Sequence, residues 1–245
     1  MKNFLISTLI LSATVFLYST NTRASNNDAL EIFIQLGSEK LVIKNPDRFI
    51  ETSQNSKEIW DLANEFVTED SIILSHYITK KDFNKYKAGE SPELKEYFYI
   101  KTPKILMGSI STQEQFDTLR KSVYSLNKDN LLNIEAYLNQ FTENYSAEES
   151  IKNGSQVKLK VGQVVPVSVN ESINNFMSFT MLSQIEIANK SKLESTTVVI
   201  TRGSCFIKGK LIFIDYFRVL SSPDDLRKSR EIVETFSKAL IKDNL

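Results

Sequence analysis

The chain has very little histidine, cysteine and glycine, and each shortage removes a class of site. The 245 residues include one histidine, His76, and one cysteine, Cys205, which cannot assemble the three or four nitrogen and sulfur ligands of a zinc centre. A lone cysteine cannot form an internal disulfide, so Cys205 is expected to be a buried apolar residue in a strand. The seven glycines do not cluster, and no P-loop, G-x-G-x-x-G, G-x-S-x-G or EF-hand motif occurs. We therefore expect neither a cofactor nor a metal.

The charge balance excludes a second class of partner. The chain carries 30 basic and 30 acidic side chains, so it has no overall positive field that would attract nucleic acid. Hydrophobic residues make up 41% of the chain and charged residues 24%, which are values typical of a globular protein.

The first 24 residues have the pattern of a secretory signal peptide. Lys2 gives a positive start, an apolar run follows from Phe4 to Tyr18, and Thr22 and Ala24 are small residues at the two positions that a signal peptidase reads. The alternative is an uncleaved anchor, but the run is shorter than the roughly 20 residues that span a bilayer as a helix. The pattern predicts cleavage after Ala24, a periplasmic or secreted protein, and no stable membrane insertion after cleavage.

Residues 25–245 are expected to form one α+β unit with antiparallel sheet and about four helices. Possible sub-halves are 25–145 and 155–245, because the polar stretch 143–155 would suit a long connection. Alternating and helical periodicities predict strands at 30–36, 41–44, 72–78, 96–101, 176–187, 196–208 and 210–220, with helices beginning near Ser56, Ser111, Asp129 and Ser222. Ser111 and Glu114 are read as a capping box. The sequence leaves open whether the two halves are duplicated.

Asp215 is one of two weak catalytic candidates, because it interrupts the apolar run 211–220. A charge inside a strand is normally paired. A two-residue turn at Lys208-Gly209 places Arg202 opposite Asp215, which favours a cross-strand ion pair. The alternatives are a turn shifted by one, which would bring Ser204 opposite, and a carboxylate in a glycan- or peptide-binding groove.

His76 is the other weak candidate. It lies in the predicted strand 72–78, where a lone histidine is usually a hydrogen-bonded core or edge residue, and a catalytic role would require a carboxylate partner. Tyr97 and Tyr99 would share one face of the next strand, either as a stacking platform or as part of a half-buried strand.

Two stretches carry a resemblance at the level of pattern. The start, LVIKNPDRFIETS followed by SIILSHYITKKDF, resembles uncharacterised exported proteins of Gram-negative bacteria. So does the ending FIKGKLIFIDYFRVLSSPDDLRKSREIVETFSKAL, which is also loosely similar to the Mog1/PsbP-type layout of an antiparallel sheet backed by helices. The resemblance implies an envelope protein and no site residues.

The leading functional interpretation is a non-enzymatic binding or accessory module of the bacterial envelope. Its partner would be another envelope protein or a small ligand. The alternatives are a carboxylate-dependent hydrolase acting on glycan or peptide, and a secreted effector. A cleft holding two carboxylates with shifted pKa values would favour the hydrolase, and an exposed apolar patch would favour the binding module.

Overall fold

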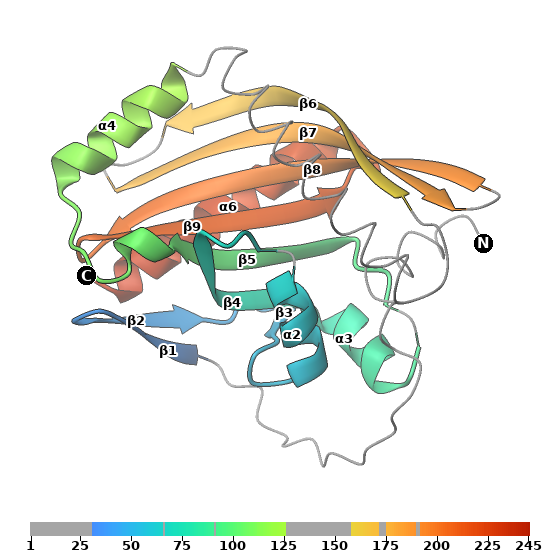
Figure 1. Cartoon of the computed structure of the whole chain (residues 1–245), viewed down its shortest axis with the longest axis horizontal. Coiled ribbons are helices and arrows are strands. Elements are labelled where there is room, and N and C mark those ends of the chain that lie inside the picture. Colours follow the sequence, from blue (N-terminus) through green and yellow to red (C-terminus); the bar gives the residue numbers. More distant parts are fainter. Residues whose placement is uncertain (1–30, 66, 91, 126–157, 172–174, 190–191) are drawn as a thin grey trace.

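Seven antiparallel strands form the central layer of the protein. The computed structural model describes residues 31–65, 67–90, 92–125, 158–171, 175–189 and 192–245. The sheet has the order β3-β4-β5-β9-β8-β7-β6, and a separate two-stranded sheet pairs β1 with β2 (Figure 1). The strands are β1 (Glu31–Leu36), β2 (Glu39–Lys44), β3 (Phe49–Glu51), β4 (Ser71–Thr79), β5 (Glu96–Pro103), β6 (Lys158–Glu171), β7 (Phe176–Asn189), β8 (Lys192–Ile207) and β9 (Lys210–Val219).

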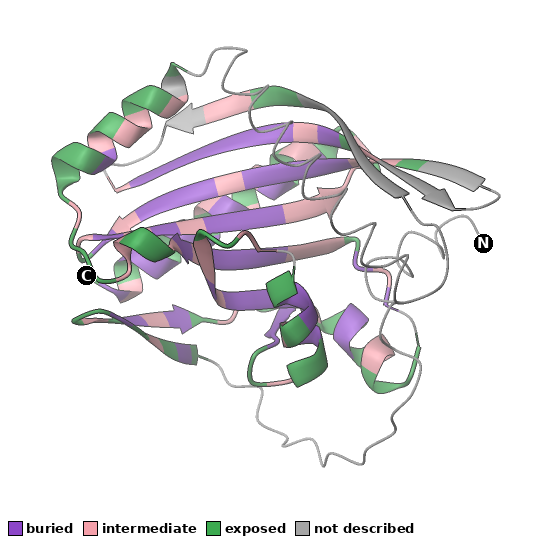
Figure 2. Ribbon diagram, viewed as in Figure 1, coloured by how far each residue is buried: buried purple, intermediate pink, exposed green. Residues whose placement is uncertain are grey.

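The longest described helix, α6 (Asp224–Asp243), covers one face of this sheet, behind the strands in Figure 1. Its residues Val233, Phe236 and Leu240 join the main core, together with inward-facing residues of the strands. Figure 2 shows this burial as a purple band through the central strands. The other described helices are shorter: α2 (Lys57–Glu65), α3 (Lys80–Lys87), α4 (Gln113–Tyr124) and the 3₁₀ helix η1 (Lys104–Leu106).

The β1–β2 hairpin is fastened to the end of α6 by one side chain. The Asn244 amide donates to the Val42 carbonyl at 2.7 Å, and the Val42 N–H donates to Asn244 Oδ1 at 2.8 Å. The carboxamide therefore forms with β2 the same pair of bonds that a neighbouring strand would form. Ile32, Leu36, Leu41 and Ile43 of the hairpin complete this side of the core.

The predicted α+β class with antiparallel sheet and about four helices is confirmed. Strands β3, β4 and β5, from 25–145, share one sheet with the strands from 155–245, because β5 pairs with β9. The predicted turn at Lys208-Gly209 is also confirmed, with Ile207 paired to Lys210. Cys205 is buried in β8, as expected. The helix expected near Asp129, the connection 143–155 and the signal-peptide segment lie outside the described residues.

Three short elements, β3, α3 and η1, were missed, and one cap was misplaced. β3 has only three residues, and α3 buries a single large apolar side chain, Phe83, so neither has a readable periodicity. The predicted capping box at Ser111 is wrong by one residue, since Thr112 and Gln115 form the reciprocal bonds. The Ser111 N–H instead donates to the carbonyl of Gly209 at 2.7 Å, which holds Ser111 outside the helix.

Candidate functional site

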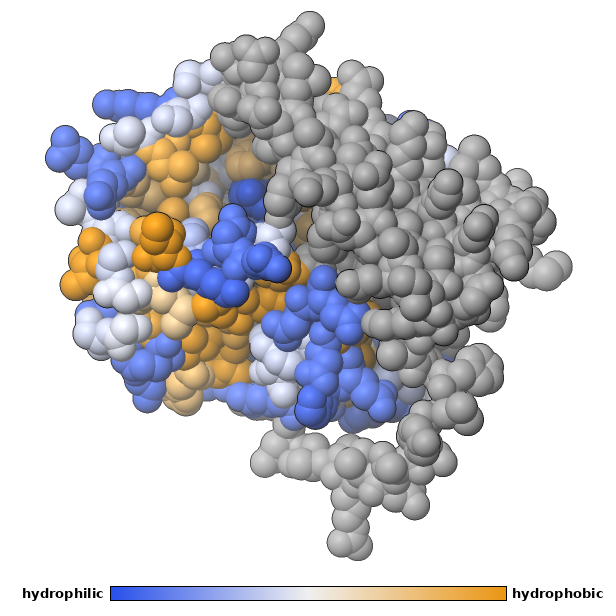
Figure 3. Space-filling view, viewed as in Figure 1, coloured by the Kyte–Doolittle hydropathy of each residue, from blue (hydrophilic) through white to orange (hydrophobic). Residues whose placement is uncertain are grey.

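The structure brings the two candidates from the sequence onto one face of the sheet, opposite α6. In the strand register His76 of β4 is paired with Tyr99 of β5, and Tyr99 is paired with Asp215 of β9. The Tyr99 ring therefore lies between the imidazole and the carboxylate. Figure 3 looks onto this face, where hydrophobic and charged groups lie side by side.

The Asp215 carboxylate is engaged by cations from both neighbouring strands. The predicted pairing with Arg202 is confirmed: the guanidinium binds both carboxylate oxygens, with Nη2 2.7 Å from Oδ2. Lys101 of β5 adds a second cation, with Nζ 2.6 Å from Oδ2. Burial acts to raise the pKa of Asp215, but Arg202 and Lys101 outweigh it and hold the pKa well below its usual range. The side chain is therefore an ionised carboxylate with both oxygens bound, and it holds no proton to donate.

His76 is held as a neutral imidazole. Burial lowers the pKa of His76 to about 3, because the charged ring would lose its hydration. The Nδ1 atom lies 3.1 Å from Oγ1 of Thr52, and the ring stacks on Tyr99 with 4.7 Å between centroids. His76 is thus fixed by a hydrogen bond and a stacked ring.

Aromatic rings continue the same face beyond Tyr99. Tyr97 and Tyr99 share the face, as expected, and meet edge to face with centroids 5.8 Å apart. Tyr97 stacks on Phe217 of β9 at 4.9 Å. Burial raises the pKa of both tyrosines, so their hydroxyls remain protonated. Together with His76 and Asp215 these rings form one packed cluster on the face of the sheet opposite α6.

A different part of the surface is hollowed. A groove of about 770 Å³ runs between one flank of α6 and the connection from β2 to β3. Its size falls in the range of ligand sites, roughly 300–1,000 Å³. Apolar side chains and charged side chains of both signs line it: Lys44, Asn45, Pro46, Asp47, Arg48, Phe49, Arg218, Lys228, Glu231, Ile232, Thr235, Phe236, Ala239, Leu240 and Asp243.

Ion pairs lie toward both ends of the groove. At the C-terminal end of α6, Lys44 Nζ lies 2.9 Å from Asp243 Oδ1. Toward its start, Lys228 Nζ lies 2.9 Å from Asp224 Oδ2. The groove therefore offers charges of both signs around an apolar stretch that includes Ile232, Phe236 and Ala239.

A network of charges anchors the start of α6 beside this groove. Glu96 accepts from Arg48 at 2.7 and 3.0 Å, from the Tyr216 hydroxyl at 2.6 Å and from Arg218 at 2.9 Å. Arg218 Nε also donates to Asp225 at 2.8 Å. Burial and the adjacent Glu96 carboxylate raise the pKa of Tyr216, which keeps its hydroxyl as a donor.

The sequence explains why the helix starts here. Asp225, an acid of the first turn, accepts from the backbone N–H groups of Ser221 and Ser222, at 2.9 and 2.8 Å, and so anchors the start of the helix. The groove itself was missed by the sequence reasoning. Its two walls come from residues 44–49 and 228–243, and no local pattern indicates that segments so far apart meet.

The described residues contain neither a metal-binding group of side chains nor a membrane-spanning helix. None of their His, Cys, Asp and Glu side chains gather in groups of three or more that could hold a metal ion. None of their helices combines the length and the hydrophobicity needed to cross a bilayer.

No family model matches the sequence, and no curated protein is significantly similar to it. Among solved structures, the chain is similar to the Ran-binding protein Mog1p of Saccharomyces cerevisiae and to a point mutant of Mog1. In each case the TM-score is 0.33 and the identity 11%, over 87% of this chain and 92% of the other. A TM-score of 0.33 assigns neither a fold nor a function to this chain.

Proposed function

We propose that this chain is an exported binding module of the bacterial envelope, and that the groove along α6 holds an extended segment of another envelope protein. The observation that carries the proposal is the groove of about 770 Å³, with an apolar middle and paired charges toward its ends. The signal-peptide pattern of residues 1–24 supports the location.

The dimensions suit a peptide. The lining residues of α6 run from Lys228 to Asp243, which corresponds to roughly 22 Å at 1.5 Å per helical residue. An extended strand covers that length with about seven residues at 3.3 Å each. Ile232, Phe236 and Ala239 would contact apolar side chains of the segment.

The charges suit the same occupant. Because cations and anions both line the groove, a ligand of one sign would meet repulsion as well as attraction. A peptide presents apolar side chains, charged side chains of either sign and a polar backbone. We expect the bound segment to place an acidic side chain near Lys228 and Arg218 and a basic side chain near Asp47.

Site-specific photo-crosslinking in living cells tests the proposal. A photoreactive phenylalanine derivative is placed at Thr235 or Ala239, which are exposed and line the groove. The control position is Lys238, which is exposed on the same helix but does not line the groove. We expect one reproducible protein adduct from the two groove positions and none from Lys238.

A blocking variant makes the test specific for the groove. Ala239→Trp fills the groove from an exposed position, and Lys238→Trp adds the same ring outside it. The adduct formed at Thr235 should disappear with Ala239→Trp and persist with Lys238→Trp. Equal adducts from all three positions, or none from any, would overturn the proposal.

A further inference from the structure

Three turns that are distant in the sequence meet at one end of the sheet, on the left of Figure 1. They are the β1–β2 turn at 37–38, the segment 104–111 that contains η1, and the β8–β9 turn at 208–209. We call this group of residues the tip. None of these residues lines the groove.

A buried lysine fixes the backbone of the tip. Lys210 is 2% exposed, and its Nζ donates to the carbonyls of Met107 and Ser109 at 3.0 and 2.6 Å. A Cβ on Gly37 would lie 3.1 Å from the Met107 carbonyl oxygen, so the β1–β2 turn also contacts this segment closely. Together with the bond from Ser111 to Gly209, these contacts fasten the segment at several points.

The fixed segment nevertheless presents two large apolar side chains to water. Ile105 is 86% exposed and Ile110 is 66% exposed. Exposed isoleucine gains no burial energy, and a mobile loop could turn such side chains inward. Here the backbone is bonded on both sides, so the two isoleucines remain outside. Figure 3 shows hydrophobic side chains reaching the surface at this end of the molecule.

Three exposed lysines lie in the tip or close to it in the sequence. Lys40, Lys104 and Lys208 are exposed, and none of them forms a salt bridge within the part of the chain that the structure describes. Lys208 Nζ donates to the Lys40 carbonyl at 3.3 Å, and Lys40 Nζ lies 4.3 Å from the Phe33 ring centroid. These contacts hold two ammonium groups near the turns without neutralising them.

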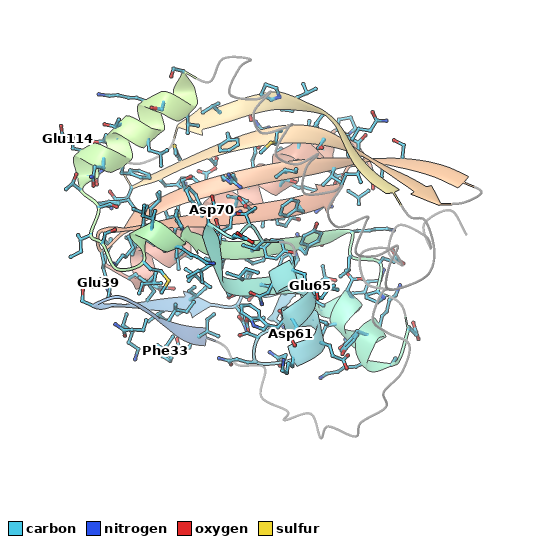
Figure 4. All side chains as sticks on the ribbon, in the orientation of Figure 1. Phe33, Glu39, Asp61, Glu65, Asp70 and Glu114 are labelled. Carbon is cyan, nitrogen blue, oxygen red and sulfur yellow. The ribbon has the colours of Figure 1, made fainter. Side chains whose placement is uncertain are left out.

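Acidic residues are also present nearby. Figure 4 labels Glu39 on the hairpin, Glu114 at the start of α4 and Asp70 next to the end of β5. The carboxylate of Asp70 accepts from the Thr68 hydroxyl, and Glu39 accepts from Ser38. None of them is paired with the three lysines among the described residues.

We propose that the tip docks on an anionic lipid bilayer, with Ile105 and Ile110 entering the boundary between headgroups and acyl chains. Two protruding aliphatic side chains, together with three exposed lysines that form no salt bridge among the described residues, match the apolar and electrostatic parts of such a surface. The contact is peripheral, reversible and sensitive to salt, because the charges act within a Debye length of about 8–10 Å. This contact would hold the protein against the membrane that bounds its compartment.

Vesicle sedimentation with the mature chain, residues 25–245, tests this inference. The probes are large vesicles of phosphatidylcholine alone and of phosphatidylcholine with one-third phosphatidylglycerol. We expect binding to the anionic vesicles that falls at least tenfold with the pair Ile105→Thr and Ile110→Thr. The matched control is Val165→Thr with Val167→Thr, two exposed apolar residues of β6 that should leave binding unchanged.

Charge variants test the other half of the proposal. Removing two tip lysines, Lys104→Gln with Lys208→Gln, should weaken binding about 25-fold, at roughly a factor of five per lysine near the surface. Removing Lys80 and Lys87 of α3 in the same way should have little effect.

The proposal is overturned if the protein does not bind anionic vesicles, or if the isoleucine variant and the valine variant bind equally well. A photo-crosslink from Ile105 to a protein, without vesicle binding, would also overturn it and assign the tip to a protein contact.

Discussion

Lys101 Nζ lies 2.6 Å from Oδ2 of Asp215, the same oxygen that accepts from the guanidinium of Arg202. The carboxylate is 3% exposed and lies between two cations on neighbouring strands. Removing the anion alone would leave two like charges close together in a largely buried site. Removing one cation would leave the other pair intact.

We therefore expect Asp215→Asn to destabilise the protein by about 3 kcal/mol, and Lys101→Met by clearly less. Urea unfolding at neutral pH measures both. The lowered pKa of Asp215 gives a stabilising contribution that is complete above about pH 4 and declines as the pH falls toward the folded-state pKa. A loss below about 1 kcal/mol for Asp215→Asn would contradict this account of the ion pair.

This cluster shows how much of the site the sequence could predict. Arg202 and Asp215 lie on strands joined by a two-residue turn, so their pairing follows from the turn and the alternation of the strands. Lys101 belongs to β5, and the pairing of β5 with β9 joins residues more than a hundred positions apart. No turn fixes that register, so neither Lys101 nor the position of Tyr99 between His76 and Asp215 could be read from the sequence.

The fold, too, was predicted where local sequence defines an element and missed where it does not. Hairpins and long amphipathic segments, such as β8–β9 and α6, were predicted because local periodicity and turns define them. α3 begins after its cap, Thr79, but it was missed because Phe83 is its one large buried apolar residue. A single apolar position leaves no helical periodicity to recognise. The groove was missed because it depends on how α6 lies against residues 44–49.

The single histidine, His76, is expected to make the free energy of unfolding depend on pH. His76 is 5% exposed and its pKa is lowered to about 3, whereas an unfolded histidine titrates near 6.5. Between these values the unfolded chain binds a proton that the folded protein does not, so stability falls as the pH falls. We expect a loss of about 2 kcal/mol between pH 7 and pH 5.

His76→Gln supplies the control for this prediction, because glutamine stays neutral and can still bond to Thr52. Urea unfolding across the same pH range should show a nearly flat free energy of unfolding for this variant. If the wild type and His76→Gln lose equal stability on acidification, another group is responsible. Carboxylates contribute little above pH 5, since their unfolded pKa values lie near 4.

The approach of α6 to the sheet depends on Gly203 of β8. A Cβ at this position would lie 2.8 Å from Cγ1 of Val233 and 3.1 Å from Oγ of Ser237, closer than side-chain carbons normally come. We expect Gly203→Ala to lower the free energy of unfolding by about 1–3 kcal/mol through overpacking. Gly108→Ala is the matched control, because a Cβ on Gly108 would meet no atom within 4 Å.

A double variant identifies the cause of that loss. Val233→Ala opens space beneath α6, so Gly203→Ala combined with Val233→Ala should be less destabilising than the sum of the two single changes. Strict additivity would show that the loss at Gly203 does not come from contact with Val233.

Export can be tested independently of any ligand. If residues 1–24 are a signal peptide, the full chain produced in a Gram-negative host should yield a periplasmic product that begins at Ser25. Ala24→Leu places a large side chain at the last position before the cut and should leave the precursor unprocessed. Arg23→Leu adds the same side chain at a position the peptidase does not read, so processing should continue. Intact mass and cell fractionation report both outcomes, and a full-length cytoplasmic product from the unaltered sequence would contradict the proposed location.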